Sequence, residues 1–197
     1  MRASFVPLLQ WILSWWSSSS KNLVLAADAS TLGERFTVLL ISVVVRGCGI
    51  PVAWKIVGAT DKGSWKPYWI ELFELIQPGI PHDWKVIVTT DRGLYALWMY
   101  EAIVQCQWHP FMRINQQGFY RLTTHERGFS PAWMPLQELI VKVGQDFQGH
   151  VTCFKRNSLS CTLLARWDEG YSDPWLIVTD LPPSEAKICW YGMLPLD

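Results

Sequence analysis

Two apolar runs of β-type residues each stop at an aspartate, and this arrangement constrains the fold more than any other feature of the 197-residue chain. One run covers residues 23–27 and stops at Asp28, and the other covers residues 86–90 and stops at Asp91. Runs of this length and composition are typical of buried strands. Each aspartate is therefore expected at a strand end, where two neighbouring carboxylates can share a hard cation. Taken singly, each aspartate is as well explained by a turn or a helix cap.

The remaining apolar segments follow a definite order along the chain. Two further β-type runs follow Asp28 and are joined by a turn that contains glycine. Apolar residues at helical spacing come before and after the run that stops at Asp91. The predicted segments are strands at residues 36–45 and 50–57 and helices at residues 69–76 and 94–103. Three strands, a helix, a strand and a helix is the order of an RNase H-like core, so we predict an α/β fold with an RNase H-like mixed sheet flanked by helices.

Three short segments carry a family resemblance. Residues 25–30 read Leu-Ala-Ala-Asp-Ala-Ser, residues 89–95 read Thr-Thr-Asp-Arg-Gly-Leu-Tyr, and residues 174–181 form a β-type run near the C-terminus. In these segments the chain resembles the DDE transposases of bacterial insertion sequences, in the group with a β-strand insertion between the second and third acids. The resemblance covers about residues 23–193. It implies that Asp28 and Asp91 are catalytic and bind Mg²⁺ or Mn²⁺.

The third acid is where the chain departs from this family. The family carries Tyr-x-x-Arg-x-x-x-Glu on a helix, and the resemblance places Tyr191 at the first position, near DNA phosphate. Leu194 stands where the arginine is expected, and the glutamate would fall beyond Asp197. Pro195 also disfavours a continuing helix. We therefore expect a C-terminally truncated, catalytically deficient copy, with Glu185 as the nearest substitute acid.

The chain is expected to divide into four segments. They are an N-terminal helix remnant with a Ser linker at residues 1–22, the first part of the core at residues 23–114, a β-strand-rich insertion at residues 115–172, and the final core strand with a truncated catalytic helix at residues 173–197. The strands expected in the insertion are residues 119–122, 139–143, 150–155 and 161–167. Ser184 is the expected N-cap of the last helix.

The N-terminal segment is strongly apolar from Phe5 to Trp16. It imitates a secretory signal, but it is rich in tryptophan and too short to span a bilayer. We favour a helix from a preceding DNA-binding or dimerisation region, and we expect no membrane partner.

Charge is balanced, with 17 basic and 17 acidic residues. Nucleic-acid-binding proteins usually carry a basic excess, because neutralising phosphates supplies much of their affinity. Any DNA contact must therefore come from local cations, although most of these are better explained as solvated surface residues. The nucleic-acid-binding candidates are Arg92, Arg113, Arg121, Lys155, Arg156 and Tyr191, with Arg127 as a further local cation.

The five cysteines form an odd count without a Cys-x-x-Cys motif. This usage is typical of a reduced, cytoplasmic protein without a disulfide framework. A zinc site from Cys153 and Cys161 with His150 or His125 is an alternative, but the spacing matches no standard zinc motif.

Two functions from different classes remain open. The first is a transposase-like protein of DNA transposition, with transposon-end and target DNA as partners. The second is a non-enzymatic regulator that pairs with full-length transposase or with transposon ends, as a homo- or hetero-oligomer.

Overall fold

A computed structural model of the chain describes residues 4–16, 21–59, 64–123 and 132–193. The chain divides into two compact units, residues 1–110 and residues 111–197. Each unit is described by itself below. The four segment boundaries expected from the sequence stay predictions.

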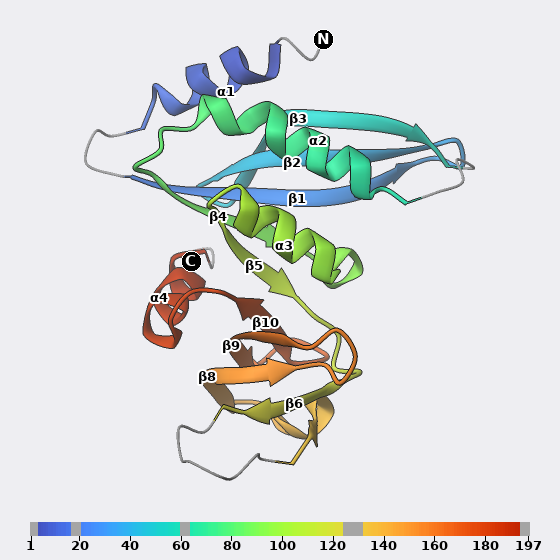
Figure 1. The fold of residues 1–197 in the computed structure, drawn as a ribbon, viewed down its shortest axis with the longest axis vertical. Helices are drawn as coiled ribbons and strands as arrows, with labels where there is room; N and C mark the ends of the chain where they lie inside the picture. Colours follow the sequence, from blue (N-terminus) through green and yellow to red (C-terminus); the bar gives the residue numbers. More distant parts are fainter. Residues whose placement is uncertain (1–3, 17–20, 60–63, 124–131, 194–197) are drawn as a thin grey trace. The chain divides into compact units, whose positions relative to one another are not determined.

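In its described residues, the first unit contains a mixed sheet and three α-helices (Figure 1). Its elements are α1 (Phe5–Leu13), β1 (Asn22–Leu32), β2 (Phe36–Val45), β3 (Cys48–Gly58), α2 (Lys66–Ile76), the 3-10 turn η2 (Gln77–Gly79), β4 (Lys85–Thr90), the 3-10 turn η3 (Arg92–Leu94) and α3 (Leu97–Gln105). Strand β5 (His109–Arg113) crosses the boundary between the units.

The strands of the first unit lie in the order β3-β2-β1-β4. Strands β1, β2 and β3 form an antiparallel meander, and β4 pairs parallel to β1 after the crossover through α2. This order, with a helix before β4 and another after it, confirms the predicted RNase H-like fold.

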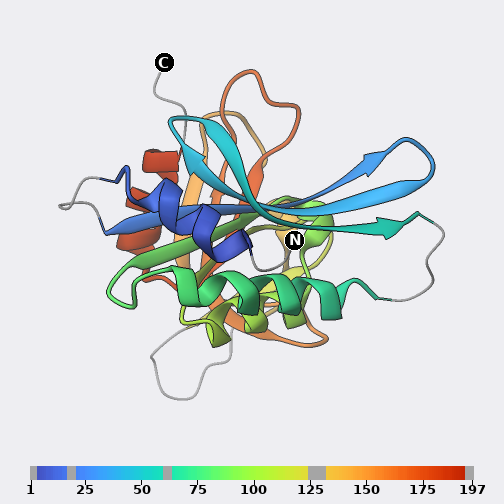
Figure 2. The same cartoon turned by 90° about the horizontal axis from the view of Figure 1, so that it is seen from above.

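The helices cover the buried face of this sheet. Helices α2 and α3 contact each other and lie side by side in Figures 1 and 2. Alternate residues of β1 point into the core, because successive side chains of a strand face opposite ways. Leu23 and Leu25 are fully buried, and Ala27 is 3% exposed. Trp69, on α2, is among the largest fully buried side chains.

Helix α1 belongs to the core of the first unit. It contacts α2, β3 and η2, with Phe5, Leu9, Ile12 and Leu13 buried. The helix ends at Leu13, three residues before the end predicted from its apolar run. The Ser14 hydroxyl donates a hydrogen bond to the Trp11 carbonyl oxygen, a local contact that competes with helical pairing.

The described part of the second unit is an antiparallel sheet with one α-helix. Its elements are the residues of β5 from Phe111 onward, β6 (Phe119–Leu122), β7 (Met134–Pro135), the 3-10 turn η4 (Leu136–Glu138), β8 (Asp146–Cys153), β9 (Leu159–Arg166), β10 (Trp175–Thr179) and α4 (Pro183–Met193). The strand order is β5-β10-β9-β8-β6-β7, and α4 contacts β8 and β9.

The strand predicted at residues 139–143 is wrong. The side-chain oxygen of Gln145 accepts hydrogen bonds from the backbone N–H groups of Val141 and Lys142, so a local turn takes the donors that a strand would use. Val141 is 64% exposed, which shows that this apolar run is not a core strand.

The predicted N-cap of the last helix is also wrong. Helix α4 begins at Pro183, so Ser184 lies inside it. The Ala186 N–H donates to the Pro182 carbonyl oxygen, and proline is well suited to a first helical position because it lacks a donor that would go unused there.

Among the described residues, no helix is long and apolar enough to cross a membrane.

Candidate active site

The parallel pairing of β1 with β4 ends directly before the two predicted acids. The register runs from Asn22 opposite Lys85 to Ala27 opposite Thr90. Asp28 and Asp91 are the next residues on their chains, and the backbone of Asp91 is still extended, with φ −73° and ψ 162°. Neighbouring strands lie roughly 4.8 Å apart, and residues at one level share a face of the sheet. The register therefore leads to both aspartates, each one residue beyond its last pair, Ala27 and Thr90.

Asp28 does not end its strand, contrary to the sequence prediction. Strand β1 continues to Leu32 because β2 supplies partners as far as Phe36. What ends at Ala27 is the pairing with β4. Asp28 is exposed at the point where β1 leaves its parallel neighbour.

Side-chain contacts are present at both ends of the β1–β4 pair. Near the acids, the Thr89 hydroxyl donates a hydrogen bond of 3.3 Å to the Leu25 carbonyl oxygen. At the far end, Lys21 Nζ lies 2.6 Å from Asp83 Oδ2. The hydrogen bond from Lys21 lowers the pKa of the Asp83 carboxyl. Both groups of that pair are exposed, so the pair adds little stability.

Each acid has its own local environment. The Ser30 hydroxyl donates a hydrogen bond of 2.7 Å to Asp28 Oδ2. Asp91 precedes η3, and its carbonyl oxygen accepts from the Leu94 N–H at 3.0 Å. The exposed Arg92 follows it, so one nucleic-acid candidate lies next to the second acid.

The donor set fits a hard divalent cation. Carboxylate and hydroxyl oxygens are the ligands that Mg²⁺ and Mn²⁺ prefer, and water can complete the coordination. Within the described ranges, no group of three or more His, Cys, Asp or Glu side chains could hold a metal ion. Glu185, the substitute acid suggested by the sequence, lies in the first turn of α4 in the second unit.

The basic candidates of the second unit divide into two places. Lys155 lies over the ring of Phe119 at 3.5 Å, and Arg121, two residues along β6 from Phe119, lies over Trp133 at 5.0 Å. The exposed Arg156 follows Lys155 in the β8–β9 turn. We call Arg121, Lys155 and Arg156 the β6–β8 cations.

Arg113 lies apart from these residues. It is on β5, which β10, β9 and β8 separate from β6. Its guanidinium lies 4.1 Å from the Trp175 ring centre and 3.8 Å from Asp173. The side chain of Tyr191 and all of Arg127 lie outside the described structure. The aromatic partners of these cations come from distant segments, so sequence spacing did not reveal them.

The zinc alternative gains no support. Cys153 and Cys161 are buried on adjacent strands. A hydrogen bond with Cys153 and burial raise the pKa of the Cys161 thiol. Within the described residues, neither cysteine belongs to a group of three or more His, Cys, Asp or Glu side chains that could hold a metal ion. His150 Nδ1 lies 3.4 Å from the Thr162 hydroxyl, and His125 lies outside the described residues.

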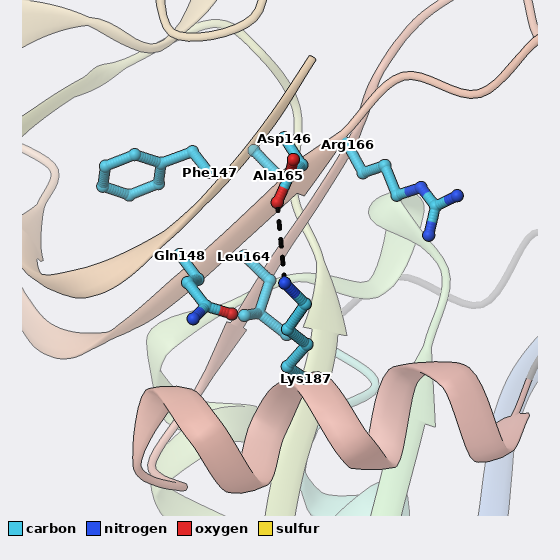
Figure 3. A pocket seen from close by; sticks show the side chains of 7 residues that line it. All are labelled: Asp146, Phe147, Gln148, Leu164, Ala165, Arg166 and Lys187. Carbon is cyan, nitrogen blue, oxygen red and sulfur yellow. Dashed lines mark ion pairs between the residues drawn. The ribbon is translucent and has the colours of Figure 1, made fainter. Parts of the chain in front are cut away.

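One small cavity of the second unit and one of the first unit lie away from the acids. The one in the second unit has a volume of about 20 Å³, room for about one water, and Figure 3 shows Lys187 of α4 reaching Asp146 at 3.9 Å across it. The one in the first unit has a volume of about 110 Å³ and lies between α2 and α3. Its lining includes Glu74, Gln77, Gln105 and Cys106.

Comparison with known proteins gives fold likenesses at low identity. No family model matches the chain, and no curated protein matches it. A piggyBac transposase synaptic complex with hairpin DNA is similar, with a TM-score of 0.45 and 10% identity over 89% of this chain, which spans 38% of that transposase chain. Ciona intestinalis Endonuclease V, in complex with an inosine-containing 24mer DNA, has a TM-score of 0.48 and 11% identity over 95% of this chain and 85% of that one. The catalytic domain of human Endonuclease V has a TM-score of 0.46 and 11% identity over 93% and 84% of the two chains.

Proposed function

We propose that this chain is a transposase-like protein that acts on DNA, with Asp28 and Asp91 as the ligands of Mg²⁺ or Mn²⁺. The observation that supports the proposal is the β1–β4 register, whose last pair, Ala27 and Thr90, directly precedes both acids. We infer that the two carboxylates lie at one level on one face of the sheet. Two carboxylates so close repel each other, and a divalent cation relieves that repulsion.

The chemistry supported is phosphoryl transfer. When bound, the metal polarises a phosphate oxygen and lowers the pKa of a water or a 3′-hydroxyl for attack on phosphorus. Asp28 and Asp91 would supply the carboxylate ligands, and the β1–β4 pairing that directly precedes both residues supports their backbones. Two carboxylates are a small ligand set for this work, so we propose weak metal binding and slow or no strand cleavage.

The proposed nucleic-acid contacts are local. The β6–β8 cations, Arg92, Arg113 and Tyr191 are proposed to contact the phosphates of transposon-end or target DNA, since the chain has no overall positive charge. Pairing with another transposase copy belongs to the same proposal.

The test is Mn²⁺ binding by calorimetry to the full chain and to Asp28→Asn and Asp91→Asn. Each variant is expected to bind Mn²⁺ at least about tenfold more weakly, because each loses a charged ligand. Glu34→Gln is the control, since it removes an exposed carboxylate from the turn after β1 and should leave Mn²⁺ affinity unchanged. Unchanged affinity in both aspartate variants would overturn the site.

A second measurement separates chemistry from binding. Nicking of supercoiled plasmid in Mg²⁺ or Mn²⁺ is expected to be slow and to disappear in Asp28→Asn. DNA binding without any nicking would instead support a non-enzymatic role on transposon DNA.

A further inference from the structure

Ser30 is placed to control the geometry of the first acid. It lies two residues beyond Asp28 on β1, so the alternation of the strand puts both side chains on the same face. Its hydroxyl donates to Asp28 Oδ2 at 2.7 Å, a short hydrogen bond to a carboxylate. Both residues are exposed, so this contact is not part of the core.

The neighbouring strand offers Asp28 no side-chain donor of this kind. In the antiparallel pair, Leu40 stands opposite Asp28 and Val38 stands opposite Ser30. The pairing with β4 has ended one residue earlier, at Ala27. On the β2 side, Asp28 therefore stands opposite an apolar residue. Its polar neighbour, Ser30, comes from its own strand.

We propose that Ser30 is a positioning residue for the metal site, an inference that rests on the proposed function of Asp28. The hydrogen bond occupies one lone pair of Oδ2 and limits rotation of the carboxylate. Oδ1 is left for the cation. Carboxylates that bind metals are generally held by such outer contacts, and their loss typically weakens metal binding by about 10- to 100-fold.

The experiment compares Mn²⁺ affinity of the full chain with that of Ser30→Ala, Ser30→Thr and Thr31→Ala. Ser30→Ala should bind Mn²⁺ about tenfold more weakly, and Ser30→Thr should restore the affinity because it keeps a hydroxyl. Thr31→Ala is the matched control, since it removes an exposed hydroxyl from the opposite face of the same strand. The thermal midpoint without metal should be the same in all four proteins.

The possible outcomes distinguish a failure of the Ser30 role from a failure of the proposed metal site. If Asp28→Asn loses Mn²⁺ binding while Ser30→Ala retains it, Ser30 has no positioning role and the metal site stands. Equal losses in Ser30→Ala and Thr31→Ala, or no rescue by threonine, would also overturn the role of Ser30. A full chain that binds no Mn²⁺ would overturn both proposals.

Discussion

Cys106 is a buried residue whose thiol has a raised pKa, although no sequence motif marks it. It caps the C-terminal end of α3 and is 8% exposed. Burial, with a smaller contribution from Glu74, raises the pKa of its thiol from 9.0 to about 11. The folded state therefore favours the neutral thiol, and a thiol of this kind is a poor nucleophile.

This shift predicts a loss of stability at alkaline pH. A pKa raised on folding adds stability that is present in full below pH 9 and disappears as the pH rises through about 11. Cys106→Ala should therefore lose less unfolding free energy than the native chain across that window, as measured by urea denaturation at several pH values. Cys48→Ala, which removes an exposed thiol, is the control and should follow the native chain. Parallel profiles for the native chain and Cys106→Ala would contradict the prediction.

Strands and helices whose apolar residues recur at a regular period were predictable from the sequence. Segments whose structure depends on the hydrogen bonds of a single side chain were not. The strands and helices of the first unit lie in the predicted order because their apolar runs match a strand or a helix period. Residues 139–143 have a strand's composition, but the Gln145 side chain takes their donors. No local pattern reveals that contact.

The position of each candidate acid after a β-type run was predictable from the sequence, but the local structure around Asp28 was not. An aspartate at the end of an apolar run marked both acids. The sequence could not show that β1 continues to Leu32, because that continuation depends on pairing with β2. The Ser30 contact could have been suspected from its spacing, since residues two apart on a strand share a face.

Helix α1 provides a prediction at the element scale. Leu9 is fully buried beside Gly79, whose position leaves little room for any side chain. Leu9→Ala should lower the unfolding free energy by about 2–5 kcal/mol, because it leaves a cavity in the core. Trp11→Ala on the same helix should cost about 0.5 kcal/mol or less, since Trp11 is 58% exposed. Similar costs for the two variants, measured by urea denaturation, would show that α1 does not pack as described.

At the scale of the whole molecule, equal numbers of basic and acidic residues limit how the chain can attract DNA. Long-range attraction should be weak, so affinity must depend on cations gathered at one place. The β6–β8 cations are such a group, and contacts with aromatic rings leave the positive charges of Lys155 and Arg121 in place.

The salt dependence of DNA binding tests this arrangement. Each phosphate contact contributes about 0.9 to the slope of log affinity against log salt for duplex DNA. Arg121→Ala and Lys155→Ala should each reduce the slope by about that amount, as measured by fluorescence anisotropy with a short duplex. Lys142→Ala, which removes an exposed cation from the same unit, should leave the slope unchanged. Equal slopes for all four proteins would place the DNA contacts elsewhere.

The register between β1 and β4 has a consequence for how the site tolerates mutation. A slip of one residue along β1 would turn Asp28 to the opposite face and would also turn Leu23 and Leu25 out of the core. The spatial relation of the two acids is therefore maintained by the same burial that maintains folding. Replacing either aspartate leaves this register intact, so the backbone positions of residues 28 and 91 would persist in descendants for as long as they fold.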